Sequence, residues 1–203
     1  MKKIIVDSSE LDEPSLDSSR RDFLRNSVLA TAGLSLASTD AFARTHHKRG
    51  AKKSLILRST HLNKTFKADY FDGERYNITG LFQIDKALMD YRAWQIARID
   101  LKLVELLHEI NHYVRRRHGV ERIDVLSGYR SPKTNRYLRR HSRGVAKHSY
   151  HMKAQAVDIH VPGVRLRTLR HIAKGIGMGG VGYYPRSGFV HVDVGPVRSW
   201  RRG

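Results

Sequence analysis

Apolar side chains recur every three or four positions in two stretches of the chain, residues 81–91 and residues 100–119. This spacing is typical of amphipathic α-helices, which bury one face. At the ends of the longer stretch, Asp100 is placed to cap the first turn and Gly119 to end the last one. The sequence therefore predicts two helices in the first half of the folded part.

Short apolar runs bounded by turn residues predict β-strands. Residues 54–73 contain such runs, with breaks at residues 63–64 and 72–73, and this arrangement predicts a β-hairpin followed by a turn. Residues 123–126 and 156–161 are apolar enough to predict two buried strands.

The second half of the chain mixes both patterns. A short helix is predicted over residues 134–140, and another from Arg165 onward, followed by glycine-rich turns. Residues 188–195 alternate between polar and apolar side chains. On a strand this alternation places His191 and Asp193 on one face and the intervening valines on the other.

The first 43 residues have the pattern of an export signal. Arg20 and Arg21 precede a weakly apolar run that ends in Ala-Phe-Ala at residues 41–43. This order is typical of a twin-arginine signal peptide cleaved after Ala43. The apolar run is shorter than the ~20 residues that span a bilayer. We therefore expect residues 1–43 to be removed on export to the periplasm, which leaves no stable membrane span.

Two further segments complete the expected organisation. Residues 44–53 are basic and have almost nothing to bury, so we predict a flexible lead-in. Residues 54–203 contain all the predicted helices and strands and have the size of one domain.

The charge and the cysteine content limit the kinds of site and partner that the protein can have. The chain carries 38 Lys and Arg against 19 Asp and Glu, a net charge of +19, and it has no cysteine. The lack of cysteine excludes disulfides, thiolate metal sites and a cysteine nucleophile. A basic protein is expected to meet an anionic partner. For an exported chain without a base-stacking or groove-reading motif, we expect the cell wall and no nucleic acid.

The segment HSYHMKAQAVDIH, residues 148–160, concentrates side chains that bind metals. His151 and Asp158 are seven positions apart, which corresponds to ~10 Å along a straight helix. On a straight strand the same offset would point them to opposite faces. Zinc ligands lie about 2 Å from the ion. The pair can therefore share an ion only if the chain turns between them, and we expect that turn at residues 153–155.

A third ligand has to come from another element, and His191 on the predicted strand is the best candidate. Antiparallel neighbours place residues about 5 Å apart on one face. Two histidines and one carboxylate leave a coordination position open for water, which is the catalytic arrangement. An ion held in this way lowers the pKa of its water and polarises a carbonyl, as amide hydrolysis requires.

A competing motif lies in the helix predicted over residues 100–119. His108 and His112 belong to His-Glu-Ile-Asn-His, which matches the H-E-x-x-H pattern of metalloproteases. These histidines lie beside the apolar stripe, however, and Glu109 and residues 115–117 form an ordinary solvated face. Because a match of five residues can arise by chance, we prefer the site around His151.

Three stretches, SGYRSPKTN, SYHMKAQAVDIHV and GVGYYPRSGFVHVDVGPVRSW, together resemble the zinc-dependent D-alanyl-D-alanine peptidases. That group also contains lysostaphin-type enzymes and hedgehog signalling domains. The likeness is closest to a twin-arginine-exported branch of murein endopeptidases, and it extends from about residue 54 onward. The family pattern is Ser-x-His, an aspartate seven residues after that histidine, and a histidine on a later strand.

The resemblance implies roles for individual residues. His151, Asp158 and His191 correspond to the Zn²⁺ ligands. Arg130 corresponds to an arginine that stabilises the developing oxyanion or holds a substrate carboxylate, and a guanidinium suits both tasks. Asp193 is expected to act as the catalytic base or to orient a ligand. In an alternative register, Asp193 is the ligand and His191 the base.

Three positions depart from the family pattern. The usual glycine three residues after the first ligand is Ala154. The glutamate often found three residues before the last histidine is Gly188, and the histidine that some relatives have two residues before it is Phe189. These departures leave the general base unassigned.

Together these patterns predict an α+β domain in which a small antiparallel sheet, flanked by helices, carries a zinc site. The expected function is that of a periplasmic murein endopeptidase acting on peptidoglycan stem peptides and cross-links. Three alternatives stay open at this point: a non-catalytic zinc-containing module that binds the wall, a D,D- or L,D-carboxypeptidase acting on stem peptides, and a nucleic-acid binder driven by charge.

Overall fold

The computed structural model describes residues 50–142 and 144–202. The predicted signal peptide and residues 44–49 of the lead-in lie outside the described residues. The elements are β1 (Lys53–Ser59), β2 (Lys64–Phe71), α2 (Ile78–Ala87), α3 (Leu101–His118), β3 (Arg122–Ser127), α4 (Pro132–His141), the 3₁₀ helix η1 (Tyr150–Lys153), β4 (Ala156–His160), α5 (Leu166–Ile176), β5 (Gly180–Tyr184), β6 (Phe189–Asp193) and β7 (Arg198–Arg201).

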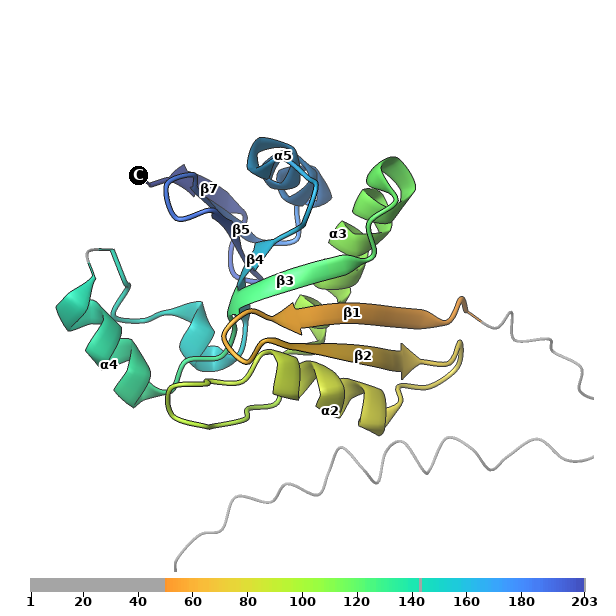
Figure 1. Ribbon diagram of the computed structural model, residues 1–203, viewed down its shortest axis with the longest axis horizontal. Helices are drawn as coiled ribbons and strands as arrows, with labels where there is room; N and C mark the ends of the chain where they lie inside the picture. The colour runs from red at the N-terminus through yellow and green to blue at the C-terminus, as the bar shows by residue number, and fades with distance from the viewer. Residues whose placement is uncertain (1–49, 143, 203) are drawn as a thin grey trace, which may run out of the picture. The chain divides into compact units, whose positions relative to one another are not determined.

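The described strands form one sheet in the order β2-β1-β3-β4-β6-β5-β7. The twisted sheet runs from the β1–β2 hairpin to the C-terminal strands in Figure 1. Strands β1 and β3 pair in parallel, as do β5 and β7, and the other neighbours are antiparallel. The predicted α+β class is confirmed, but the sheet is larger than the small antiparallel sheet expected from the sequence, and it is mixed.

Strands β5 and β7 account for the larger size of the sheet, and the parallel pairs β1–β3 and β5–β7 make it mixed. The glycines of β5 are typical of turns, and β7 has exposed, basic side chains with no apolar alternation. Gly182 is required by packing, because a Cβ there would lie 2.7 Å from the ring of Trp200 on β7. Glycine at this position of β5 therefore lets the ring of Trp200 lie close against the backbone of the strand.

The helices lie where the apolar spacing predicted them. Helix α3 is capped by the Asp100 side chain, which accepts from the Lys102 amide at 2.9 Å, and it ends at Gly119 with φ +67°. Helix α2 ends at Ala87, so the predicted periodicity up to Tyr91 extends one turn beyond the helix. None of the helices in the described part of the chain is long and apolar enough to cross a membrane.

One hydrophobic core joins the helices to the sheet. Helix α2 contacts β1 and β2, α3 contacts β1 and α5, and α5 contacts β5 and β6. Alternate residues of the central strands, among them Val157, Ile159, Val190 and Val192, are fully buried in this core. Since successive side chains of a strand point to opposite faces, the residues between them face away from the core. Asp158 and His191 are two of these residues.

Candidate metal centre

Asp158 and His191 are brought together by strand register. They are directly opposite each other on the antiparallel strands β4 and β6. Both positions alternate with valines and isoleucine that belong to the core, so the two polar side chains share the outer face of the sheet. The alternation of His191 and Asp193 predicted from the sequence is confirmed, because their side chains contact each other on this face.

His151 reaches the same place from η1. The Ser149 hydroxyl accepts from the His151 amide at 3.3 Å and caps this short helix. The chain then reverses at Ala154, whose φ is +55°, and enters β4. The turn expected at residues 153–155 is thus confirmed. A left-handed conformation costs a non-glycine residue roughly 1 kcal/mol, which explains the glycine preferred at this position in the family that the sequence resembles.

The three side chains form a compact set of donor atoms. Asp158 Oδ1 lies 2.9 Å from His191 Nδ1 and 3.3 Å from His151 Nε2, and the two nitrogens are 3.2 Å apart. Ligands placed about 2 Å from one zinc ion in tetrahedral geometry are roughly 3.3 Å from each other. The triangle of donors therefore fits an ion of this kind. No other group of three histidine or carboxylate donors that could hold a metal ion occurs among the described residues.

The second nitrogen of each histidine is held by the protein. His151 Nδ1 donates to the Gly128 carbonyl at 2.7 Å, and His191 Nε2 donates to Asp193 Oδ2 at 3.0 Å. When both rings are neutral and carry their proton on that side, as metal binding requires, His151 Nε2 and His191 Nδ1 present lone pairs to the shared space. This arrangement is how proteins fix the tautomer of metal-binding histidines.

Asp193 lies behind His191, on the side of the ring opposite Asp158. It is fully buried and accepts from the Gly180 and Gly195 amides at 3.2 and 2.9 Å. Its two oxygens also accept hydrogen bonds from Nη1 and Nη2 of Arg198, at 3.0 and 2.8 Å, so that the guanidinium forms a fork on the carboxylate. The alternative register, with Asp193 as ligand, would require this carboxylate to leave all these partners.

Arg130 contacts the carboxylate of Asp158 from the other side. Its Nη2 donates to Asp158 Oδ2, and its Nε donates to the Ser127 hydroxyl at 2.8 Å. Asp158 is therefore held on one oxygen by arginine and offers the other to the histidines. The loop that carries Arg130 is fixed by the Tyr129 amide, which donates to the Leu88 carbonyl at 2.7 Å.

Burial and charge set the protonation of the three donors. Burial lowers the pKa of His151, which favours the neutral ring that coordination requires. Burial alone would raise the pKa of Asp158, but attraction to His151 and Arg130 and hydrogen bonds from both histidines hold it well below its ordinary value. Burial opposes protonation of His191, yet its hydrogen bonds to Asp158 and Asp193 raise its pKa overall.

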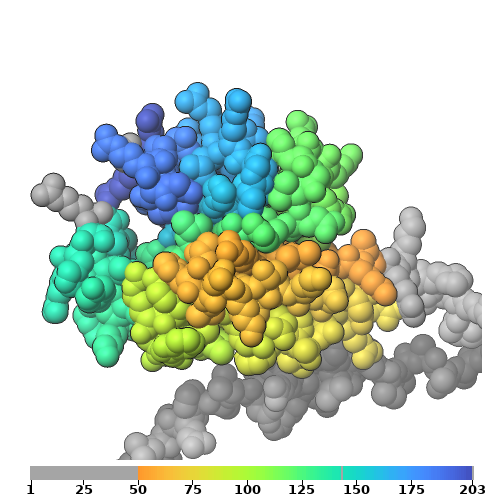
Figure 2. Space-filling view, viewed as in Figure 1, coloured from red at the N-terminus to blue at the C-terminus, as the bar shows by residue number. Residues whose placement is uncertain are grey.

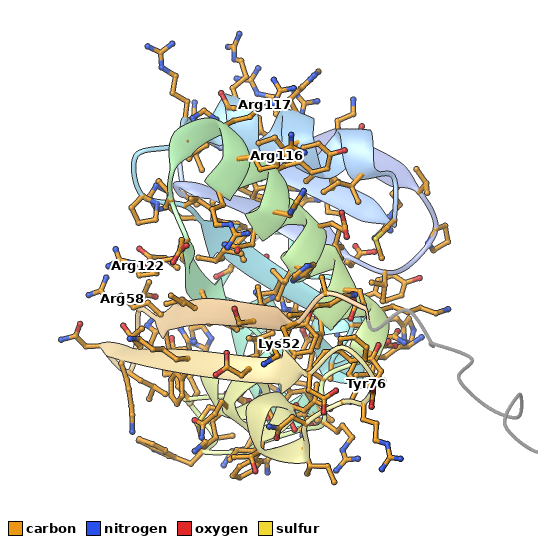
Figure 3. The ribbon with its side chains drawn as sticks, turned by 90° about the vertical axis from the view of Figure 1, so that its right-hand side faces the viewer. Lys52, Arg58, Tyr76, Arg116, Arg117 and Arg122 are labelled. Atoms are coloured by element: carbon orange, nitrogen blue, oxygen red, sulfur yellow. The ribbon has the colours of Figure 1, made fainter. Side chains whose placement is uncertain are left out.

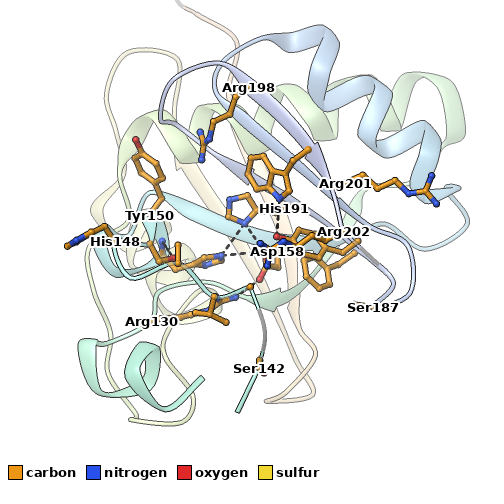
Figure 4. Close-up of a pocket in the computed structure, with 18 residues that line it drawn as sticks. Arg130, Ser142, His148, Tyr150, Asp158, Ser187, His191, Arg198, Arg201 and Arg202 are labelled. Carbon is orange, nitrogen blue, oxygen red and sulfur yellow. Dashed lines mark hydrogen bonds and ion pairs between the residues drawn. The ribbon is translucent and has the colours of Figure 1, made fainter. Parts of the chain in front are cut away.

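The donors lie in a cleft of about 620 Å³. Figure 4 shows His191 and Asp158 at its centre, with Arg130 below them, Tyr150 to the left and Arg198 above. In the described part of the chain, His148 is the one histidine or carboxylate that lines this cleft besides the three donors. The aromatic lining consists of Tyr150, Tyr184, Phe189 and Trp200.

Arg198 is the residue of this centre that the sequence patterns did not identify. Its guanidinium lies 5.3 Å from the ring centre of Tyr150 and 4.9 Å from that of Trp200, while its fork binds Asp193. The available signal was its position five residues after Asp193 in HVDVGPVRSW. Among so many arginines, that spacing alone did not distinguish it from a surface residue.

The competing histidines lie elsewhere. His108 and His112 line a separate cavity of about 250 Å³ with Lys52 and Arg115. Figure 3 shows Lys52 at the start of β1, in front of α3. His108 also packs edge-on against the ring of Tyr70, with a centroid distance of 6.1 Å. Among the described residues these two histidines have no third metal donor within reach.

A buried His, Asp and His set that opens into a cleft of an α+β domain is the arrangement of a metallopeptidase active centre. Comparison with known proteins agrees with this class. Residues 47–200 match an M15 peptidase family described as peptidoglycan L,D-endopeptidase MepK, and the chain belongs to this family.

Individual relatives show how far the similarity extends. The chain is 42% identical over 183 residues to the peptidoglycan L,D-endopeptidase MepK of Escherichia coli K12, covering 88% of this chain and 98% of the relative. The protein of the same name from Shigella flexneri gives the same values. A probable peptidoglycan L,D-endopeptidase MepK of Haemophilus influenzae is 37% identical over 147 residues, which is 72% of this chain and 78% of that protein. No solved structure matches the chain.

Proposed function

We propose that this protein is a zinc-dependent endopeptidase that hydrolyses peptide cross-links of peptidoglycan in the periplasm. The observation that carries the proposal is the donor triangle of His151, Asp158 and His191, with separations of 2.9–3.3 Å, at the floor of an open cleft. The names of the relatives support peptidoglycan as the substrate and an endopeptidase as the activity.

His151, Asp158 and His191 would hold a zinc ion, which would supply the Lewis acidity needed to activate water and polarise the scissile carbonyl. The protein prepares the site for this chemistry. The Gly128 carbonyl and Asp193 fix the tautomers of His151 and His191, and Arg130 fixes the carboxylate of Asp158. Because these contacts exist before any ligand binds, little reorganisation is needed at the moment of reaction.

Arg130 has a second task in this proposal. Its side chain is partly exposed to the cleft, and a guanidinium presents several N–H donors in a fixed plane. Through the guanidinium N–H groups not engaged by Asp158 and Ser127, it would stabilise negative charge that develops on the carbonyl oxygen. Asp193 acts through His191 rather than on the substrate, because it is fully buried behind that ring.

The function is tested by digesting purified sacculi and separating the released muropeptides by chromatography. We expect the wild type to open cross-links, the chelated protein to lose this activity and added zinc to restore it. His151→Ala is expected to lose both bound zinc and product release, whereas His108→Ala, outside the centre, keeps both. Intact cross-links under every metal condition would instead support a non-catalytic wall-binding module.

A further inference from the structure

The outward face of helix α4 is predominantly basic. Its exposed side chains are Pro132, Lys133, Arg136, Tyr137, Arg139, Arg140 and His141. The inward face is short and mostly polar, with Thr134 and Asn135 buried and Leu138 half-buried. The helix contains no aspartate or glutamate. Figure 2 shows it as a separate lobe at one edge of the molecule.

The cations of this face have no acidic partners. In the part of the chain that the structure describes, none of the four Lys and Arg side chains of α4 takes part in an ion pair. Some arginines elsewhere do have such partners: Arg58 and Arg122, which lie close together in Figure 3, both contact Asp124. Like charges three or four residues apart on a helix repel by roughly 0.2–0.5 kcal/mol per pair. An anionic partner would remove this repulsion.

Helix α4 also borders the catalytic cleft. It follows directly after Arg130, and Ser131 caps its first turn by accepting from the Thr134 amide at 3.2 Å. In the segment that follows the helix, the cleft is lined by Ser142, Gly144, Val145, Ala146, His148 and Ser149. The Asn135 side chain ties the two together by donating to the Ala146 carbonyl at 3.1 Å. Material bound on α4 is therefore held next to residues that line the cleft on both sides of the helix in the sequence, Arg130 and Ser142.

We propose that the outward face of α4 is a docking surface for carboxylates of wall peptides next to the cross-link that occupies the cleft. This inference rests on the proposed function. A polymer that carries repeated carboxylates offers partners for several arginines at once, and guanidinium groups bind carboxylates in a fork. Docking on a membrane fits less well, because membrane-surface helices present a broad apolar face and Tyr137 is the one large apolar side chain exposed here.

The test compares two substrates and two variants. One triple variant, Arg136→Gln/Arg139→Gln/Arg140→Gln, removes charge from α4. The matched control, Arg165→Gln/Arg167→Gln/Lys174→Gln, removes the same charge from α5 and the residue before it, all at exposed positions outside the cleft. Each protein is assayed on intact sacculi and on a short, soluble cross-linked peptide dimer.

The α4 variant is expected to cleave the soluble dimer like the wild type. On sacculi its kcat/KM falls roughly ten-fold, through KM, since three exposed ion pairs contribute together. Its binding to sacculi in sedimentation becomes less sensitive to salt. The α5 control keeps wild-type activity on both substrates.

Four results would overturn the inference. They are unchanged activity of the α4 variant on sacculi, an equal loss in the α5 control, an equal loss on the soluble dimer, and loss of binding to phosphatidylglycerol vesicles without loss of binding to sacculi. If the wild type cleaves neither substrate, the proposed function itself is wrong, and the two failures are thereby distinguished.

Discussion

The ring of His191 lies between two carboxylates, with Asp193 Oδ2 3.0 Å from Nε2 and Asp158 Oδ1 2.9 Å from Nδ1. The two carboxylates have different surroundings. Asp158 faces His151 and the cleft, whereas Asp193 is sealed behind the ring by backbone amides and Arg198. The ion pair of Asp193 and Arg198 therefore fixes the position of the His191 ring, and the ring in turn fixes one corner of the donor triangle.

Removing Arg198 is expected to weaken zinc binding. In Arg198→Gln the fork on Asp193 is lost, so that this carboxylate no longer holds the ring of His191 in one orientation. Changes in the groups that orient metal ligands typically cost 10–100-fold in metal affinity, and we expect a loss in this range. Competition with a chromogenic chelator measures it directly, and Arg198→Lys is expected to recover only part of the loss because lysine cannot form the fork.

The control for this experiment is Arg115→Gln, an exposed arginine on α3 whose contact with Glu121 is long, at 3.8 Å. It is expected to bind zinc like the wild type. Equal affinity of Arg198→Gln and the wild type would show that Asp193 positions His191 without help from the arginine.

Gly180 is predicted to be irreplaceable for a steric reason. A Cβ at this position would lie 2.5 Å from Asp193 Oδ2 and would also clash with the guanidinium of Arg198. Gly180→Ala must therefore displace the ion pair, with a loss of stability of about 1–3 kcal/mol and weaker zinc binding. Gly175→Ala is the matched control, since its Cβ meets nothing within 4 Å and an alanine near the end of α5 is expected to stabilise the helix by about 0.5–1 kcal/mol. Denaturant unfolding of the metal-free proteins compares the two.

The sequence was most informative where periodicity or a family motif was present. The capped helix α3, the β1–β2 hairpin and the turn before β4 followed from apolar spacing and turn residues. The argument that His151 and Asp158 need a turn between them used only helix and strand geometry. These features are local, so a single segment contains the information that determines them.

Long-range features could not be predicted in this way. Nothing in the sequence of β7 indicated that it pairs in parallel with β5, because its side chains are mostly exposed and basic. The partners of Asp193 come from Gly180, Gly195 and Arg198, and only the folded sheet brings Gly180 against that carboxylate. The position of Arg198 depends on this pairing as well, which is why its role was missed.

Arg130→Lys distinguishes two possible roles of the arginine, stabilising the oxyanion and orienting Asp158. Lysine keeps the positive charge near Asp158 but cannot contact Ser127, Asp158 and a substrate oxygen together. If the guanidinium stabilises the oxyanion, kcat falls about 10²–10³-fold while zinc affinity changes much less. Steady-state assays on the peptide dimer measure kcat, and chelator competition measures the zinc affinity. A parallel fall of kcat and zinc affinity would mean that Arg130 acts only by orienting Asp158.

Asp90 is predicted to stabilise the loop that carries Arg130. This carboxylate is 2% exposed and accepts from the Ser131 amide at 2.8 Å and from the amides of Arg92 and Ala93 at 3.1 and 3.2 Å. Asp90→Asn removes the charge from these hydrogen bonds and places an amino group near backbone donors. We expect a loss of about 2 kcal/mol in the free energy of unfolding at pH 7.

The pH dependence of this difference tests its origin. Burial alone would raise the pKa of Asp90, but hydrogen bonds from Thr134 and Ser131 outweigh it, so the folded-state pKa lies below the ordinary value of 3.8. The unfolded chain then takes up the proton first as the pH falls. The stabilisation is therefore fully present well above pH 3.8 and is lost as the pH falls through the folded-state pKa. Urea unfolding of the wild type and Asp90→Asn at pH 7, 5 and 3 should show that their difference in free energy of unfolding narrows only at the lowest pH.

The exposed Asp69→Asn serves as the control, and its free energy of unfolding should stay within about 0.5 kcal/mol of the wild type throughout. A gap that stays constant from pH 7 to pH 3 would mean that shape, and not the charge of Asp90, holds the loop.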